Sequence, residues 1–405
     1  MRLQGLSRSK GLPVLVWALV VGAIAWPRVE AQTFQRVYSF KVGTDGANPV
    51  AGLTIDAAGN LYGTTTSGGD SGNGTVFKVN SKGIETVLHS FAGGADGGNP
   101  EAGLLLVGTN LYGATTEGGS GGRGTVFEVT TAGKETVLHL FTSAAQGTHP
   151  QGRLVTDVAG NLYGTTSAGG KTGRGVVFKL TRPATAGGVW TEQILYSFAT
   201  GGDGATPVAG VGFDKAGNLY GTTSAGGKYG YGTVFQLTPS TSGWKETILH
   251  SFQMQTDGGV PYAGLVVDSS GNVYGAATEG GGGGSDGGGT VFELTPSSVG
   301  WTFKTLYKLP GWSSSPSGSF RNLLLVSGKI YATTHCDGNN NAGTVYELTP
   351  AGNTWKYRSL HVFTGGQDGL YSFTSPVLDA QGNLYGTTQQ GGAYGNGVVF
   401  KITPN

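Results

Sequence analysis

Short runs of valine, leucine, isoleucine, threonine, tyrosine and phenylalanine recur along the chain, and glycine-rich polar segments separate them. In the first complete copy of this pattern the runs occupy residues 50–56, 60–66, 74–80 and 85–91. Runs of this length that are rich in β-branched and aromatic residues and bounded by glycine are typical of β-strands. We therefore expect four antiparallel strands in each copy.

The copies follow one another at a nearly constant spacing. A Tyr-Gly pair marks the second strand of each copy, with Tyr-Ala in the sixth, and successive tyrosines lie 50, 51, 57, 54, 57 and 54 residues apart. A repeat of this length, built from four short strands and glycine turns, is typical of one blade of a β-propeller. The seven tyrosines are Tyr62, Tyr112, Tyr163, Tyr220, Tyr274, Tyr331 and Tyr385.

The two ends of the repeat array complement each other. Residues 34–40 read as a fourth strand without the three that precede it, whereas the last copy finishes with a third strand at residues 398–404. An N-terminal strand that joins the last blade closes the ring and removes the sheet edges that a linear array would expose. The sequence therefore predicts an all-β protein with one domain over residues 32–405. We expect a closed seven-bladed β-propeller of four-stranded antiparallel blades.

The composition narrows the possible functions. The 77 glycines and the 12% of charged residues suit a turn-rich β protein rather than a helical or disordered one. Lys plus Arg (25) nearly balances Asp plus Glu (24), and the basic residues are scattered. A nucleic-acid partner is therefore not expected. The single cysteine, Cys336, cannot form an intramolecular disulfide.

The N-terminal residues have the pattern of a secretory signal peptide. Arg2, Arg8 and Lys10 precede an apolar run over residues 12–26, and small residues flank a cleavage position after Ala31. The alternative is an uncleaved membrane anchor, for which the apolar run is short. We expect residues 1–31 to be removed, and the mature chain to be extracellular, periplasmic or in the cell envelope without a membrane span.

Several repeated polar positions have a structural interpretation. An aspartate precedes the first hairpin turn in five copies, whereas copies two and six have a shorter turn and no aspartate, so we expect this carboxylate to accept N–H groups of its own turn. The fourth strands carry His or Tyr at one position, as expected for a ring that packs while its polar tip finds a partner, and Trp190, Trp244, Trp301 and Trp355 are expected to pack between blades. The turn aspartates are Asp56, Asp157, Asp214, Asp268 and Asp379, and the ring position holds Tyr38, His89, His139, Tyr196, His250, Tyr307 and His361.

The linkers between copies carry a second set of aspartates. Asp45, Asp203, Asp257 and Asp368 each lie eleven residues before the turn aspartate of their copy, and Asp96 occupies a similar Asp-Gly linker. Oxygen ligands on loops suit calcium, but Asp-Gly is also a common turn and no copy has the alternating acidic pattern of a calcium loop. We expect no cofactor, with calcium as the alternative.

Motifs of known catalytic sites do not appear. There is no nucleophile elbow, no zinc-binding helix pattern and no cysteine pair. The Gly-Gly-x-x-Gly runs connect strand to strand, so they offer no helix N-terminus to a phosphate. His335 and Cys336 are adjacent, but a third orienting group for a nucleophile cannot be assigned. We assign no catalytic or metal-binding residue.

The repeated segments Gly-Asn-Leu-Tyr-Gly-Thr-Thr, Gly-Gly-x-x-Gly-x-Gly-Thr-Val-Phe and Leu-His-Ser-Phe resemble the GloVer tandem repeat. This repeat is found in exported bacterial proteins that are called choice-of-anchor GloVer-containing proteins. The resemblance covers roughly residues 34–404. It implies export and tandem repetition, and it supplies no catalytic residues to carry over.

Two functional hypotheses remain open at this point. An enzyme that acts on extracellular polysaccharide, a hydrolase or lyase, would show non-repeating acid and base groups in the strands that line the channel. The first strands are instead apolar and nearly identical, as in Ala-Gly-Leu-Thr-Ile and Ala-Gly-Leu-Val-Val. We therefore favour a monomeric, non-catalytic binding module for an extracellular glycan, peptide or envelope partner.

The copies differ most on the face that carries the linkers and the loops between second and third strands. Blade six and its neighbours place aromatic and amide side chains there, which suit stacking on a sugar or peptide. The alternative is that blade six has drifted without a function. The candidate ligand-binding residues are Trp312, His335, Asp337, Asn339, Tyr371 and Tyr394.

Overall fold

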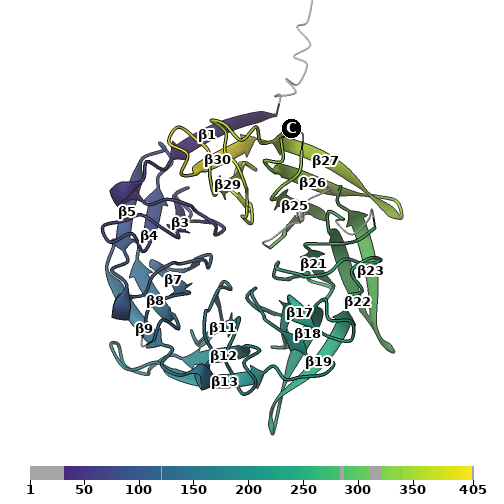
Figure 1. Ribbon diagram of the computed structural model, residues 1–405. Helices are drawn as coiled ribbons and strands as arrows, with labels where there is room; N and C mark the ends of the chain where they lie inside the picture. Colours follow the sequence, from purple (N-terminus) through teal and green to yellow (C-terminus); the bar gives the residue numbers. More distant parts are fainter. Residues whose placement is uncertain (1–31, 120, 283–286, 311–321, 339, 404–405) are drawn as a thin grey trace, which may run out of the picture. The chain divides into compact units, whose positions relative to one another are not determined.

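The computed structural model describes residues 32–119, 121–282, 287–310, 322–338 and 340–403. The predicted signal peptide, residues 1–31, lies outside these ranges. Residues 32–404 form one unit, whose described strands make seven four-stranded antiparallel sheets and one two-stranded sheet. The four-stranded sheets follow one another around a ring (Figure 1), which confirms the seven-bladed β-propeller. No helix among the described residues is long and apolar enough to cross a membrane.

In blades one to six the strands run from innermost to outermost in chain order, whereas blade seven takes its outermost strand from the N-terminus. Blade one is β2 (Thr54–Ile55), β3 (Leu61–Thr65), β4 (Thr75–Val79) and β5 (Glu85–Ser90); blade two is β6 (Leu105–Val107), β7 (Asn110–Thr115), β8 (Thr125–Thr130) and β9 (Glu135–Leu140); blade three is β10 (Val155–Thr156), β11 (Leu162–Thr166), β12 (Val176–Thr181) and β13 (Thr191–Ser197). Blade four is β15 (Gly212–Phe213), β16 (Leu219–Thr223), β18 (Thr233–Ser240) and β19 (Gly243–Ser251); blade five is β20 (Val266–Val267), β21 (Val273–Ala277), β22 (Thr290–Ser297) and β23 (Gly300–Lys308). Blade six is β24 (Leu324–Val326), β25 (Lys329–Thr334), β26 (Thr344–Ala351) and β27 (Thr354–Val362), and blade seven is β28 (Val377–Leu378), β29 (Leu384–Thr388), β30 (Val398–Thr403) and β1 (Thr33–Ser39). The two-stranded sheet pairs β14 (Gly204–Ala205) with β17 (Ala225–Gly226), and three linkers contain the 3₁₀ turns η1 (Gly43–Asp45), η2 (Gly94–Asp96) and η3 (Ala144–Gln146).

The N-terminal strand closes the ring. β1 pairs antiparallel with β30, so that Phe34 lies opposite Ile402 and Tyr38 opposite Val399, with a bulge between Arg36 and Tyr38. The same bulge interrupts the pairing of third and fourth strands in the other six blades. β1 is therefore an ordinary fourth strand supplied from the far end of the chain, as predicted.

The innermost strands are shorter than the sequence predicts. Residues 50–56 read as one strand, yet β2 contains only Thr54 and Ile55. The preceding backbone groups bond elsewhere: the N–H of Asn48 donates to the carbonyl of Asn396 in blade seven (3.0 Å), and the carbonyl of Ala51 accepts from the hydroxyl of Thr387 (3.3 Å). This part of the chain therefore joins two blades instead of extending a sheet.

The core lies between neighbouring blades and explains two repeated motifs. The phenylalanine that ends each Leu-His-Ser-Phe segment packs edge-on against the third-strand phenylalanine of the next blade, as Phe198 does with Phe235 at 5.2 Å between ring centroids. That second ring also covers the glycine of Tyr-Gly: a Cβ on Gly221 would lie 2.5 Å from Cζ of Phe235. The glycine is therefore required by the close approach of an aromatic ring.

Candidate functional site

The turn aspartates are structural, as predicted. Asp214 accepts hydrogen bonds from the backbone N–H groups of Ala216 and Asn218 (both 2.9 Å), from Nδ2 of Asn218 (2.7 Å) and from the hydroxyl of Tyr220 (3.1 Å). Desolvation by burial raises the pKa of this carboxyl, but the hydrogen bonds from Asn218 and Tyr220 outweigh it and hold the pKa below its ordinary value. The four acceptor contacts leave this carboxylate committed to its own hairpin.

Five residues at the ring position of the fourth strand find a polar partner in the following linker: Tyr38, His89, Tyr196, His250 and His361. Nε2 of His250 lies 2.8 Å from Oδ2 of Asp257, and the hydroxyl of Tyr196 donates to Asp203 at 3.1 Å. The same linker carboxylates also accept backbone N–H groups, such as that of Ala199 at 2.6 Å. The predicted exchange of His and Tyr is thus confirmed as a repeated contact between the end of a blade and the linker that follows it.

The predicted ligand-binding residues have different surroundings. The ring of His335 packs at a tilt against Tyr371 and Phe373, with ring centroids 4.5 and 3.9 Å apart. Asp337 is buried and accepts a hydrogen bond from the hydroxyl of Thr334, whereas Tyr394 is 56% exposed. The structure thus brings His335 and Tyr371 together. Trp312 and Asn339 lie outside the described residues.

The environments of these groups set their charge. Burial lowers the pKa of His335 to about 4, so this imidazole is neutral near neutral pH. Burial also raises the pKa of Asp337 above its ordinary value, although hydrogen bonds from Thr334 and Thr344 oppose the shift. The cluster therefore offers the aromatic faces of Tyr371 and Phe373 beside a neutral imidazole.

The central channel contains one charged side chain that departs from the repeat pattern. Residues from all seven blades line a hollow of about 380 Å³, and Arg153 is the one charged side chain among its described lining residues. Arg153 stands at a repeat position that other blades fill with small or amide residues. That position holds Gly52, Gly103, Arg153, Gly210, Gly264, Asn322 and Ser375.

Arg153 reaches across the channel wall from blade three to blade two. Its Nε donates to the carbonyl of Leu104 at 3.1 Å. The side chain keeps contact with solvent, while the surrounding protein lowers the pKa of the guanidinium below its ordinary value. An arginine stays protonated under all ordinary conditions. No contact of its Nη groups is found among the described residues, so the outer edge of the guanidinium can face a ligand.

A second ring position lies two residues earlier, at the end of the channel next to the linkers. Nε2 of Gln151 donates to Oε2 of Glu101 at 3.1 Å, and Tyr262 and Gln151 both line the channel hollow. Phe373, which packs against His335, occupies the same repeat position in blade seven. We call Glu101, Gln151, Arg153, Tyr262 and Phe373 the channel mouth. The predicted aromatic residues His335 and Tyr371 adjoin it through Phe373.

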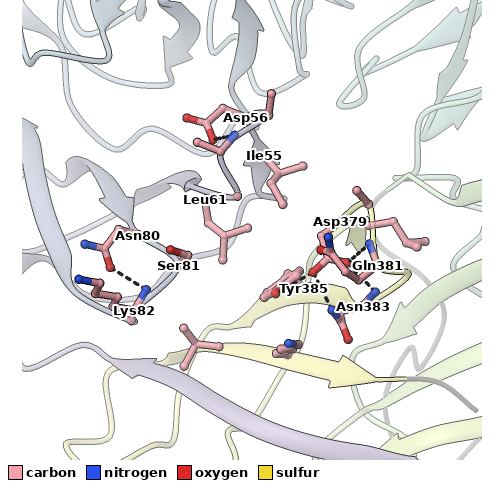
Figure 2. Close-up of a pocket in the computed structure, with 18 of the residues that line it drawn as sticks. Ile55, Asp56, Leu61, Asn80, Ser81, Lys82, Asp379, Gln381, Asn383 and Tyr385 are labelled. Atoms are coloured by element: carbon pink, nitrogen blue, oxygen red, sulfur yellow. Dashed lines mark hydrogen bonds between the residues drawn. The ribbon is translucent and has the colours of Figure 1, made fainter.

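A larger hollow lies at the opposite end of the ring, between the hairpins of blades one and seven (Figure 2). It has a volume of about 690 Å³, and both the first and the last hairpin of blade one line it, so these hairpins share one end as predicted. Its carboxylates are engaged within their turns: Asp379 accepts from Nδ2 of Asn383 (2.7 Å) and from the hydroxyl of Tyr385 (3.0 Å). We therefore place the candidate site at the channel mouth.

Arg153 is not among the residues predicted from the sequence, because the shared Ala-Gly-Leu pattern makes the first strands look uniformly apolar. Copy three reads Gln-Gly-Arg-Leu at that point, so a charged residue replaces the glycine. The signal was a single deviation inside a repeated segment. Glu101, Gln151, Tyr262 and Phe373 show the same kind of deviation two residues earlier.

The fold and the repeated contacts between its blades define a seven-bladed β-propeller made of one tandemly repeated blade. Residues 22–212 and 209–405 match the family model of the Gloeobacter/Verrucomicrobia repeat, and the chain belongs to this family. No curated protein matches the chain.

Similar solved structures share the fold at low sequence identity. An ulvan lyase of polysaccharide lyase family 25, solved with a glucuronic acid and sulfated rhamnose ligand, is 13% identical over 89% of this chain and 94% of the lyase, with a TM-score of 0.51. A putative oxidoreductase (glucose dehydrogenase) from Thermus thermophilus is 15% identical over 92% of this chain and all of that chain, with a TM-score of 0.44. At these identities the likeness extends to the fold alone.

Proposed function

We propose that the protein is an exported, non-catalytic binding module. Its ligand is an extracellular glycan, peptide or envelope component with an acidic group, held at the channel mouth. The observation that carries the proposal is Arg153, the one charge among the described residues of the channel hollow. A planar guanidinium with free edge donors matches a carboxylate or sulfate group, which it can bind with two parallel hydrogen bonds.

The neighbouring side chains suit the rest of such a ligand. Tyr262 and Phe373 offer aromatic faces, and Asn322 and Gln151 offer amide groups along the wall. Pockets that combine apolar faces with a few placed polar groups are typical of small-ligand sites. His335 and Tyr371 extend the aromatic surface beyond Phe373, and Tyr394 adds an exposed ring on the same face of blade seven.

The enzymatic alternative, a polysaccharide hydrolase or lyase, finds less support in these side chains. Burial, and then the charge of Glu279, raises the pKa of Tyr262, which makes its hydroxyl a poor base at neutral pH. The carboxylate of Glu101 accepts a hydrogen bond from Gln151. A binding role requires neither group to exchange a proton.

A glycan array screened with the chain from Gln32 onwards tests the proposal, with acidic and neutral sugars compared on the same slide. Arg153→Gln should weaken binding to acidic ligands by at least about tenfold, because it removes a charge-assisted contact of roughly 1.5–3 kcal/mol. Arg182→Gln removes an exposed charge elsewhere and serves as the matched control. Equal binding by the folded Arg153→Gln protein would refute the site, and release of reducing ends or unsaturated sugars would establish the enzymatic alternative.

A further inference from the structure

Three side chains that can ligate a metal ion meet at the outer seam between blades one and two. His89 lies near the end of β5, Asp96 ends η2, and Glu135 begins β9. Their ligand atoms lie within 4.8 Å of one another, and Nε2 of His89 is 3.0 Å from Oδ1 of Asp96. In tetrahedral zinc sites with bonds of about 2.1 Å, ligand atoms are roughly 3.4 Å apart. Side-chain movements of less than about 1 Å therefore bring the three groups to bonding distance.

One carboxylate oxygen at this seam lacks a hydrogen-bond partner within the described part of the chain. Oε1 of Glu135 is shielded from solvent, and it has no hydrogen-bond partner among the described residues. Two partly buried carboxylates that face each other need a proton or a cation between them. A metal ion bound between Asp96 and Glu135 meets this requirement.

At the equivalent described seams, other residues replace one member of this group, so that two carboxylates and an imidazole do not meet. At the seam between blades two and three, Gln146 replaces the aspartate and its Nε2 donates to Oε2 of Glu192 at 2.8 Å. Tyr38 and Tyr196 replace the histidine at two further seams, and Phe303 stacks on His250 at 3.8 Å where no glutamate is present. Among the described residues, the seam of His89 alone joins an imidazole to two carboxylates.

We propose that His89, Asp96 and Glu135 bind a divalent metal ion, for which one imidazole and two carboxylates make Zn²⁺ the best match. Solvent reaches the group through a shallow hollow of about 500 Å³ that Asp96, Glu135 and Trp190 help to line. The ion binds residues of two successive outer strands and of the linker between them. It therefore fastens blade one to blade two, a role separate from ligand binding at the channel mouth.

Titration calorimetry with Zn²⁺ tests this site in the whole mature chain, purified without a histidine tag and stripped with EDTA. We expect one ion per chain at about pH 7.5, a higher melting temperature with Zn²⁺, and a visible absorption band when Co²⁺ is the probe. Glu135→Gln should weaken Zn²⁺ binding by at least about tenfold, which corresponds to about 1.4 kcal/mol. As a control, Glu246→Gln changes the equivalent glutamate at the seam where Tyr196 replaces the histidine. This variant should leave Zn²⁺ binding unchanged.

A gain of binding gives the sharper test. Gln146→Asp places a second carboxylate beside His139 and Glu192, whose Nε2 and Oε2 are 3.5 Å apart, and should raise the stoichiometry to two ions per chain. Absence of heat and of a Co²⁺ band in the folded wild-type chain would overturn the proposal and leave a shared proton between the carboxylates. Unchanged affinity in folded Glu135→Gln would equally exclude this site.

Discussion

The carboxyl pair between blades three and four makes the stability of the protein depend on pH in an unusual direction. Glu246 lies in β19, the fourth strand of blade four, and faces Asp203, which accepts hydrogen bonds from Tyr196 and from the backbone N–H of Gly204 (2.8 Å). Burial, and then the charge of Asp203, raises the pKa of Glu246 to about 7. Its Oε1 is shielded from solvent without a partner among the described residues. The folded protein therefore binds the proton of Glu246 more tightly than the unfolded chain does.

The sign and size of the effect follow from this difference. Below about pH 4.5 the carboxyl is protonated in both states and its contribution is fully present, and the contribution is lost as the pH rises through about 7. A difference between 4.5 and about 7 corresponds to about 3.4 kcal/mol. Solvent reaches part of this side chain, and screening reduces the expected effect to roughly 1–2 kcal/mol. Stability should therefore fall between about pH 5 and about pH 8.

Glu246→Gln removes this dependence because the amide keeps a donor at every pH, as Gln146 does opposite Glu192. In urea unfolding followed by tryptophan fluorescence, with EDTA present, the variant should match the wild type at about pH 5 and exceed it by about 1–2 kcal/mol at about pH 8. Glu117→Gln, an exposed change, should follow the wild type at both values. An identical pH slope in Glu246→Gln and wild type would refute the reasoning.

Three further predictions concern the fold. A chain that begins at Val42 lacks β1, so the exposed edge of β30 should abolish cooperative melting and cause aggregation in light scattering, and an unchanged melting temperature would contradict ring closure. Asp214→Ala should lower the free energy of unfolding in urea by about 1–2 kcal/mol, because four donors lose their acceptor, whereas ligand affinity should not change. Gly221→Ala should cost about 1–3 kcal/mol through overlap with Phe235, and Phe235→Leu in the same chain should restore part of the loss; additive losses in the double variant would argue against this contact.

Repetition explains why so much of the architecture could be predicted from the sequence. Seven copies test each strand assignment seven times, and the missing strand of the last copy points to residues 34–40, which form β1. The same comparison explains Asp214, because the aspartate and its turn length vary together. The boundaries of the innermost strands were wrong because the pattern of apolar residues does not show which backbone groups bond. Residues 48–53 are as apolar as a strand, but the N–H of Asn48 and the carbonyl of Ala51 form hydrogen bonds with blade seven.

The candidate site was harder to predict because its residues come from different copies. The sequence places Glu101, Arg153 and Phe373 far apart, and each looks like a single exception within its own repeat. Only the ring brings these exceptions to one end of the channel. The glutamates at the outer contacts between blades are hard to predict for the opposite reason. They recur regularly and read as exposed residues of an edge strand, whereas the preceding blade and the linker after it half-bury them. These residues are Glu85, Glu135, Glu192 and Glu246.

Deviations from the repeat at the outer seams and at the channel position point to different roles for these two parts of the ring. At the described outer seams of His89 and His250, neighbouring blades meet through the same three repeat positions, and the exchange of Glu135 for Phe303 alters only how the contact is made. Such changes preserve the contact between neighbouring blades and affect the stability of the protein. At the channel position no such contact requires a large side chain, since a glycine satisfies the fold in four blades. The repeated fold therefore does not require an arginine here, and the guanidinium of Arg153 can pair with a bound anion.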